Sequence, residues 1–350
     1  MKLGLLQFSG GSGEDKKVNV SLESIRHVES LGFDSVWVAE AYATDAISCS
    51  TWILAQTEKI RVGTAIMQMP ARTPALAAMT AMTLSELSNN RFIVGLGASG
   101  PQVVEGWHGV PYGKPITRTR EYIKIMRAIM EREDYLNFQG DMYTVPATGE
   151  GTTGLGKPLK SMLYANAEIP IYTASITPAG LRCAAEVADG TIPVWMDPEK
   201  YHIFSKDLEA GFAKANGNKS LKDFEIATLV NVSLNNDLEA AFAFLRPRMA
   251  TYIGGMGARN KNFYNDYACK MGYADVAKKI QDLYLDGKVA EAVSAVPDSL
   301  IDEVALVGSK DRIKDRLQRW KEAGKRGEVN SMLLAVNDND ALAVVAEEIL

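Results

Sequence analysis

Residues 60–96, IRVGTAIMQMPARTPALAAMTAMTLSELSNNRFIVGL, contain two short β-rich runs with one long helical segment between them. Ile60–Ala65 and Phe92–Leu96 are rich in Val, Ile and Phe, which favour strands. The Ala, Met and Leu residues between them favour a helix that ends near Leu87, and Asn89-Asn90 marks its stop. A strand, a helix and a second strand in this order predict a βαβ unit with parallel strands.

The same alternation continues on both sides of this unit. Six further strands are expected at Leu3–Phe8, Ser35–Val38, Ile171–Thr173, Thr191–Trp195, Ile226–Val232 and Met332–Val336, and a glycine-rich turn (Gly10, Gly11, Gly13) follows the first of them. Further helices are expected near residues 18–31, 45–56, 118–130, 179–187, 311–320 and 339–350. Eight strands alternating with helices predict one α/β domain over residues 1–350, a (β/α)8 TIM barrel with insertions.

Two segments interrupt this regular pattern. Residues 134–168 carry many Gly, Thr and Pro without a clear period, so we expect an inserted lobe or a lid there. Residues 236–300 read as helical throughout and are longer than one crossover between strands needs. We therefore expect a helical insertion before the last strand.

Composition excludes several classes of protein. Apolar residues make up 47% and charged residues 23%, as in soluble globular proteins. The net charge is −5, with Lys and Arg scattered among Asp and Glu, so no nucleic-acid partner is expected. The spacing of three Cys and three His predicts no metal site and reduced, buried thiols. The start MKLGLLQF reads as a strand and no run reaches 18 apolar residues, which predicts a cytoplasmic protein that does not bind membranes.

The loops that follow the strands build the active site in barrels of this kind. After the second strand, Glu40 and Tyr42 place an acid and an aromatic ring at the rim, where they suit proton transfer or contact with a ring system. Glu40 or Asp45 could equally favour the start of the next helix. After the third strand, residues 63–70 change from small to bulky apolar side chains, which fits either a surface for a flat ring or ordinary core packing.

Two later loops are also candidates. Residues 95–102 are glycine-rich, so their backbone can approach a ligand closely. They match GxGxxG formally, but Pro115 and Ile116 stand where a dinucleotide-binding fold needs an acidic residue. Residues 173–180 begin a helix with Pro178 in its first turn, and free N–H groups there suit a phosphate, although an ordinary Ser/Thr cap explains the pattern too. No GxSxG turn follows a strand, which disfavours hydrolysis.

Together these loops resemble the luciferase-like superfamily, and within it the branch that uses the deazaflavin coenzyme F420. The chain is similar to methylenetetrahydromethanopterin reductases, and more similar to bacterial F420-dependent oxidoreductases of unassigned substrate. The likeness runs nearly end to end, in residues 30–46, 62–74, 91–115, 117–126, 170–193 and 275–308, of which 91–115 is the most specific. The resemblance implies a TIM barrel that transfers a hydride between F420 and a small organic substrate, usually as a homodimer.

The resemblance also implies where the coenzyme binds. A cis peptide bond at Ala65-Ile66 is expected behind the middle of the ring. The implied coenzyme contacts are Glu40, Ala65, Ile66, Met67, Gly97, Ala98, Ser99, Gln102 and Val103 around the ring, and Ala174, Ser175, Ile176, Thr177, Pro178, Ala179 and Gly180 around the phosphate. Relatives commonly have Gly where Thr177 precedes the proline of this turn.

This sequence departs from the family at the residue that handles the proton. Many relatives carry Asp-His after the second strand, whereas this chain has Glu40-Ala41. The candidates for the catalytic acid or base are therefore Glu40, Tyr42 and His108. Trp107, Tyr164 and Trp195 are candidates for the apolar walls of a substrate pocket. Two alternatives stay open: an FMN-dependent monooxygenase of the same fold, and a flavin-binding barrel without catalytic activity.

Overall fold

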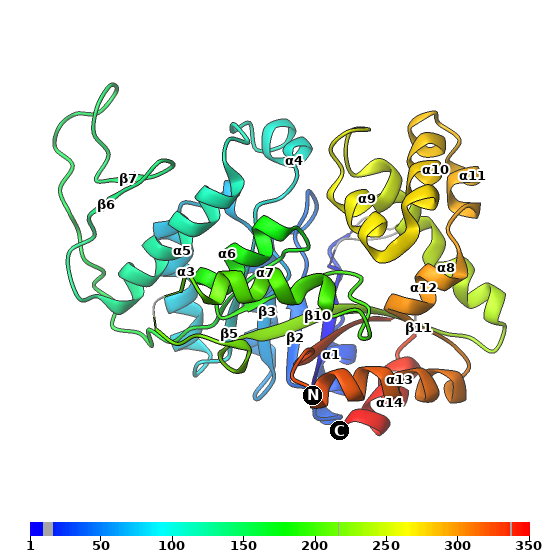
Figure 1. The fold of residues 1–350 in the computed structure, drawn as a ribbon. Helices are drawn as coiled ribbons and strands as arrows, with labels where there is room; N and C mark the ends of the chain where they lie inside the picture. Colours follow the sequence, from blue (N-terminus) through cyan, green and yellow to red (C-terminus); the bar gives the residue numbers. More distant parts are fainter. Residues whose placement is uncertain (10–16, 216, 337) are drawn as a thin grey trace.

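A computed structural model describes residues 1–9, 17–215, 217–336 and 338–350, and its centre is a closed barrel of eight parallel strands (Figure 1). Each strand pairs with the next and the last pairs with the first, in the order β1 (Lys2–Gln7), β2 (Ser35–Val38), β3 (Arg61–Thr64), β5 (Phe92–Gly97), β8 (Ile171–Thr173), β9 (Gly190–Thr191), β10 (Glu225–Leu234) and β12 (Ser331–Val336). This confirms the predicted (β/α)8 barrel. The predicted turn at Gly10, Gly11 and Gly13 lies outside the described residues.

Helices surround the barrel. They are α1 (Leu22–Ser30), α2 (Ala46–Gln56), α3 (Pro74–Leu87), α4 (Pro101–Gly106), α5 (Pro115–Glu131), α6 (Pro178–Val187), α7 (His202–Phe212), α8 (Leu238–Ala250), α9 (Phe263–Ala268), α10 (Ala274–Leu285), α11 (Val289–Ser294), α12 (Asp298–Val304), α13 (Lys310–Lys325) and α14 (Asp340–Ile349). Many begin at a capping side chain: Ser21, Asp45, Thr73, Thr177 and Ser309 each accept a backbone N–H from the first turn. The two chain ends lie close together beside α13 and α14 in Figure 1.

A second, smaller core fills the inside of the barrel. Trp37 on β2 stacks on Tyr172 on β8, with ring centroids 5.6 Å apart. A Cβ atom at Gly63 would lie 2.5 Å from the Trp37 ring, and one at Gly4 would lie 3.0 Å from it. The two glycines therefore make the space that this large side chain occupies between β1 and β3.

Two strands differ from the sequence prediction. The strand expected at Thr191–Trp195 is only Gly190–Thr191, because Pro193 has no N–H for a ladder and Trp195 has a left-handed backbone (φ 53°). The chain keeps one further contact to β10, an isolated bridge between Val194 and Leu229. The short strand β11 (Ala305–Gly308), which the sequence analysis did not predict, pairs with β10 outside the ring of eight.

The insertion at residues 134–168 packs beside α5. It contains a two-stranded hairpin of β6 (Phe138–Gln139) and β7 (Thr144–Val145), which lies along the outer side of α5 (Figure 1). The buried Glu121 carboxylate on α5 accepts the backbone N–H groups of Asp141, Met142 and Tyr143 at 2.8–3.0 Å. This anchor holds the hairpin against the helix, and a role of the insertion as part of a lid stays a prediction.

The second insertion is helical, as predicted, but not throughout. It comprises α8 to α12 with a π-helical turn at Thr251–Gly255 and another at Cys269–Tyr273. Residues 256–262 form turns, and a Cβ atom at Gly257 would lie 2.3 Å from the Lys261 carbonyl oxygen. This close approach explains why a break with glycine interrupts the helices here.

The structure also bears on the predicted state of the cysteines and on membrane-spanning helices. All three cysteines are free; Cys49 and Cys183 are buried, whereas Cys269 is partly exposed, so the prediction that all are buried was wrong for one of them. Burial raises the pKa of the Cys183 thiol to about 11, which keeps it protonated. Within the described parts of the chain, no helix is both long enough and apolar enough to span a bilayer.

Candidate active site

The mouth of the barrel, at the carboxyl ends of its strands, has a floor of small residues on one side. Side chains alternate between the inside and the outside of a barrel, and Trp37, Ile93 and Tyr172 point inside. The inward positions that end these strands are therefore Ala39, Gly97 and Ala174, with Ala65 packed against the same inner core. They come from four neighbouring strands, β2, β3, β5 and β8. The strand ends in this half of the mouth thus carry small residues, and Ile66 is the bulky side chain that packs beside them.

The chain between β3 and β4 (Met67–Gln68) runs over this floor. It contains a cis peptide bond at Ala65-Ile66, as the resemblance implied. A Cβ atom at residue 97 would lie 2.4 Å from two side-chain carbons of Ile66, so only glycine fits beneath this side chain. The Met67 side chain is fully buried in the outer core, which leaves only its backbone for contact with a ligand in the mouth.

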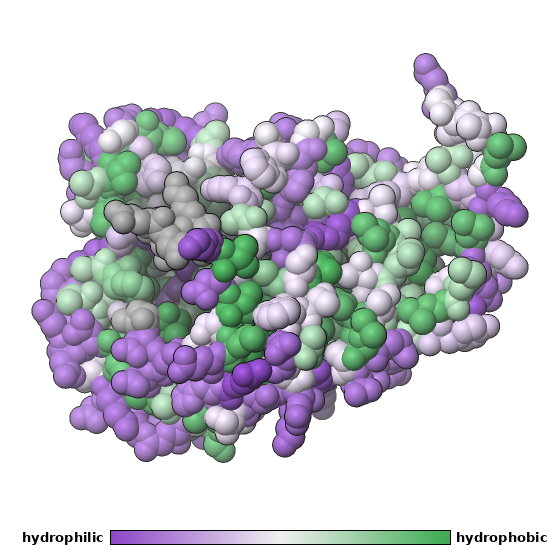
Figure 2. All heavy atoms as spheres, turned by 180° about the vertical axis from the view of Figure 1, so that it is seen from behind, coloured by the Kyte–Doolittle hydropathy of each residue, from purple (hydrophilic) through white to green (hydrophobic). Residues whose placement is uncertain are grey.

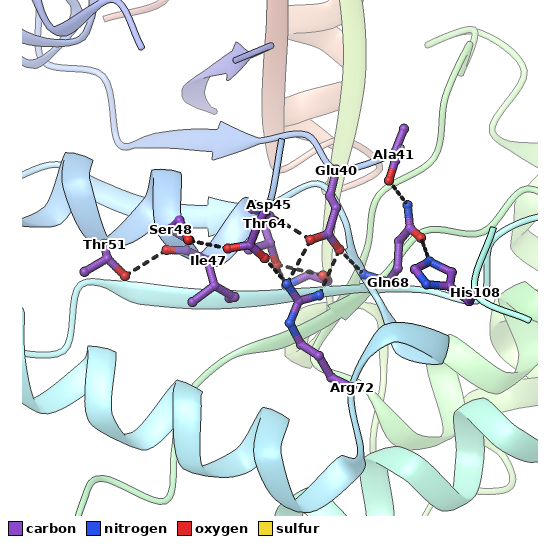
Figure 3. Close-up of polar contacts among 12 residues, drawn as sticks. Glu40, Ala41, Asp45, Ile47, Ser48, Thr51, Thr64, Gln68, Arg72 and His108 are labelled. Atoms are coloured by element: carbon purple, nitrogen blue, oxygen red, sulfur yellow. Dashed lines mark hydrogen bonds and ion pairs between the residues drawn. The ribbon is translucent and has the colours of Figure 1, made fainter. Parts of the chain in front are cut away.

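Glu40 lies at the centre of a network of ion pairs and hydrogen bonds (Figure 3). Its carboxylate accepts the Ala46 N–H at 3.1 Å and the Gln68 N–H at 2.7 Å. The Arg72 guanidinium donates to both carboxylate oxygens, at 2.9 and 3.0 Å, and also pairs with Asp45. Four N–H donors therefore occupy Glu40, which ties the loop after β2 to β4 and to the start of α2.

Arg72 and Asp45 keep their charges in this network. Burial lowers the pKa of Arg72, but its hydrogen bonds to Glu40 and the charges of Glu40 and Asp45 outweigh burial and raise it. Burial raises the pKa of Asp45, yet hydrogen bonds from Ser48 and the charge of Arg72 bring it below its ordinary value. The pair therefore stays ionised near neutral pH. Asp45 also caps α2, so the interpretation of these acids as helix-start residues holds.

His108 joins the same side of the mouth through Gln68. The Gln68 side-chain amide donates from Nε2 to the Ala41 carbonyl at 2.7 Å, and its Oε1 meets Nε2 of His108. Gln68 was not among the predicted site residues, although it is the one polar side chain in the apolar run Ala65–Met69. Tyr42 is 65% exposed, and its ring lies 6.3 Å from that of Trp107. The three catalytic candidates thus gather on one sector of the rim.

The turn before α6 offers backbone donors. The Thr177 hydroxyl accepts the Gly180 N–H at 3.2 Å, and a Cβ atom at Gly180 would lie 2.7 Å from the Ser175 hydroxyl. Among the described residues, no acceptor meets the N–H groups of Ser175, Ile176, Thr177 and Ala179. Free N–H groups at a helix start attract an anion.

The loop after β5 borders this turn. Ser99 has a left-handed backbone (φ 59°), and Gly100 precedes α4, whose first turn contains Pro101. Ala98, Ser99 and Val103 are partly exposed and Gln102 is exposed, so this loop is accessible along the rim.

The three aromatic residues predicted to line a substrate pocket lie in three different environments. Trp195 is 4% exposed and packs against Tyr252 and Tyr264 of the helical insertion, with ring centroids 5.6 Å away in both pairs. Trp107 stands exposed at the rim beside Tyr42. Tyr164 does not line the mouth: its ring lies 3.6 Å from the guanidinium carbon of Arg132, at the end of α5 that leads back to the strand starts. Sequence could not place it, because the insertion has no periodic pattern.

The protein is an eight-stranded α/β barrel. Its polar groups and free backbone N–H donors lie at the carboxyl ends of the strands, where barrel enzymes carry their active sites. Residues 2–327 match the family model for luciferase-like monooxygenases, and the chain belongs to this family.

Proteins with similar sequences are known in bacteria and archaea. A Mycobacterium tuberculosis protein, provisionally named a coenzyme F420-dependent oxidoreductase, is 41% identical over 326 residues, which cover 93% of each chain. The 5,10-methylenetetrahydromethanopterin reductase of Methanolobus tindarius is 25% identical over 92% of this chain and 93% of its own. These matches confirm the resemblance that the loops indicated.

Solved structures share the fold. The coenzyme F420-dependent tetrahydromethanopterin reductase of Methanopyrus kandleri superposes with a TM-score of 0.77 at 20% identity, over 99% of this chain and 98% of its own. An F420-dependent secondary alcohol dehydrogenase, solved with an F420–acetone adduct, gives a TM-score of 0.73 at 22% identity over the same shares. Both therefore support the luciferase-like barrel.

Proposed function

We propose that this chain is an F420-dependent oxidoreductase that transfers a hydride between the coenzyme and a small organic substrate. The observation that carries the proposal is the set of small residues Ala39, Ala65, Gly97 and Ala174 at the strand ends of half of the mouth, which suits a flat ring laid against the Ile66 segment. The 41% identical relative, with its provisional F420-dependent name, supports the choice of coenzyme.

The residues present fit such a coenzyme at both of its ends. Gly97 and the Ile66 side chain would lie behind the ring, and the free N–H groups of Ile176, Thr177 and Ala179 would hold a phosphate. Bound F420 would supply a ring carbon that accepts or donates the hydride. The protein would orient the reactants and exclude water.

Among the catalytic candidates, His108 is the one that we propose to carry the proton. Glu40 already receives four N–H donors, and the Tyr42 ring is largely exposed. His108 is held through Nε2 alone, and no described residue meets its other ring nitrogen. That nitrogen can accept or return a proton at the rim.

Separate titrations of the purified protein with F420 and with FMN test the coenzyme. We expect tight binding of F420, seen as a change in its fluorescence, and weaker binding of FMN. Tight binding of FMN with oxygen consumption in the presence of a reductant would instead support the FMN-dependent monooxygenase, a coenzyme that a structural relative carries. Binding of F420 without oxidation of its reduced form by any acceptor would support the non-catalytic alternative.

The same proposal includes a homodimer in the cytoplasm. The 134–168 insertion exposes large apolar side chains, with Leu155 at 83% and Met162 at 94%. Figure 2 shows hydrophobic residues on the face beside a segment that projects from the body. Sedimentation velocity should give the mass of two chains, and Leu155→Ser with Met162→Ser should shift it toward one. Absence of a nucleic-acid partner stays a prediction from composition.

A further inference from the structure

Arg248 differs from every other arginine of the protein. Each of the others donates a guanidinium hydrogen bond to a carboxylate, amide, hydroxyl or carbonyl oxygen. Arg248 donates none to any described residue and forms no ion pair there. Its neighbour Arg246, on the same helix, pairs with both Glu239 and Asp298. A guanidinium has five N–H donors, and no described residue takes up any of those of Arg248.

The position of Arg248 is set by two aromatic rings. Its guanidinium carbon lies 4.6 Å from the centroid of Phe8 and 5.8 Å from that of Tyr252. Phe8 directly follows β1 and is 46% exposed, and it is the next inward position after Leu6 of the inner core. Arg248 is itself only partly exposed. The cation therefore stands over the mouth of the barrel, and the rings keep it there.

The neighbouring strand end adds polar groups. On β10, Ala227 and Leu229 belong to the inner core, so Asn231 and Ser233 are the next inward positions toward the mouth. Both are buried, and the Ser233 hydroxyl has no hydrogen-bond partner. A buried hydroxyl without a partner is rare, and it suits an acceptor group brought by a ligand.

This sector lies across the mouth from the turn before α6. Three strands separate β1 from β8 in either direction around the barrel. The floor of small residues belongs to β2, β3, β5 and β8, whereas Arg248, Phe8 and Ser233 belong to the side of β10, β12 and β1. A ring tethered at α6 would therefore leave the Arg248 sector free for a second molecule.

We propose that Arg248 binds the carboxylate of the substrate, which is a small organic acid with an apolar or aromatic body. A planar guanidinium matches a carboxylate with two parallel hydrogen bonds. Phe8 and Tyr252 give the body of the acid a wall of rings, and the buried Trp195 packs behind Tyr252. This inference rests on the proposed function, because it names the class of substrate that the oxidoreductase takes.

Phenylacetate and phenylacetamide are a matched pair of probes, because they differ in the carboxylate alone. Their binding to the full-length protein, loaded with F420, is measured by isothermal titration calorimetry. We expect phenylacetate to bind at least tenfold more tightly than the amide. Arg248→Gln should remove this difference. Arg248→Lys keeps the positive charge but not the two parallel N–H donors of the guanidinium, so it should keep part of the difference. Arg26→Gln, at an arginine on α1 that contacts Gln56, is the control and should bind like the wild type.

Three results would overturn the inference. The first is equal binding of acid and amide by the wild type, or no binding of either. The second is an Arg248→Gln variant that keeps the preference for the acid. The third is a loss of F420 binding by Arg248→Gln along with that of phenylacetate, because Arg248 would then hold an anionic part of the coenzyme. If Arg248→Gln does not fold, as judged by its thermal unfolding, the wild type and Arg248→Lys decide the question.

The proposed function can fail separately. If the wild type binds phenylacetate through Arg248 but does not bind F420, the site for an acid stands and the coenzyme assignment falls. If F420 binds and both probes fail, the coenzyme assignment stands and the acid substrate falls.

Discussion

Glu40 and Arg72 face each other in a two-pronged ion pair, with one guanidinium nitrogen on each carboxylate oxygen at 2.9 and 3.0 Å. Both side chains are largely buried, at 8% and 12% exposure. Two backbone N–H groups share the same carboxylate, one from the start of α2 and one from β4. The acid that sequence suggested as a catalyst therefore serves to join three segments of the rim.

Replacement of Glu40 tests this structural role. Glu40→Gln keeps the shape but removes the charge opposite Arg72, so we expect the free energy of unfolding to fall by about 2 kcal/mol. Urea unfolding measures the change. Glu86→Gln, at an exposed acid on α3 whose side chain has no partner among the described residues, is the control and should stay within about 0.5 kcal/mol of the wild type. A Glu40→Gln variant of unchanged stability but slow turnover would return Glu40 to the list of proton carriers.

His108 gives a second prediction, about the position of its proton. The Ala41 carbonyl can only accept, so the Gln68 amide must turn its nitrogen to Ala41 and its oxygen to His108. Neutral His108 should then carry its hydrogen on Nε2. Nitrogen-15 chemical shifts of the ring report this tautomer, with His108→Asn to assign the signals. Observation of the Nδ1-protonated form would refute the arrangement.

The role of His108 in turnover is a separate test. We expect His108→Asn to lower kcat by about 10²-fold or more, the usual scale for loss of a general acid or base, with coenzyme affinity nearly unchanged. Gln68→Leu should lower kcat by less, because it only frees the ring to turn. His27→Asn, on the exposed face of α1, is the control. An undiminished kcat in His108→Asn removes His108 from the mechanism.

Sequence predicted the barrel well because its strands carry strong local patterns. Ser35–Val38 and Ile171–Thr173 are found as predicted, since each is a buried apolar run between turn residues. The strand at Thr191–Trp195 was overextended, because its composition favours a strand while Pro193 ends the ladder. The short β11 lies directly after a helix without a turn residue, which hides its start.

The candidate site was only partly accessible from sequence. Loop position alone placed Glu40, His108 and the α6 turn at the mouth, because parallel strands bring their carboxyl ends together. The roles of Gln68 and Arg248 depend on contacts with residues 27 and 240 positions away, respectively, which no local pattern reports. Tyr164 was misplaced because the insertion that carries it has no periodic pattern.

Gly97 allows a test of the floor. A Cβ atom there would collide with Ile66, so we expect Gly97→Ala to lower the free energy of unfolding by about 1–3 kcal/mol and to weaken coenzyme binding. Gly106→Ala is a matched control, since nothing lies within 4 Å of a Cβ atom at that position. Equal stability of the two variants would show that the Ile66 side chain does not press on β5.

The opposite end of the barrel gives a prediction about pH. Glu225, on β10, accepts from Lys2 at 2.9 Å and from the Ser331 hydroxyl. Burial raises the pKa of this carboxyl, but its hydrogen bonds to Ser331, Lys2 and Tyr172 and the charge of Lys2 bring it below its ordinary value. The unfolded chain then takes up a proton at higher pH than the folded one. The stabilisation is therefore complete above the unfolded pKa of about 4.3, and it is lost as pH falls through that value toward the lower, folded pKa.

Glu225→Gln isolates this contribution, because glutamine cannot titrate. Chemical unfolding at a series of pH values from 7 to 3.5 should show the wild type losing stability below about pH 5, and the variant losing less over the same range. At pH 7 the variant should be less stable by about 2 kcal/mol, because Lys2 loses its charged partner. Glu168→Gln, at an exposed acid near the same end, should follow the wild-type curve. If the free energy of unfolding of the wild type and of Glu225→Gln fell in parallel with pH, other carboxylates would account for the acid sensitivity. The contacts of Glu225 would then not favour its charged form over its protonated form.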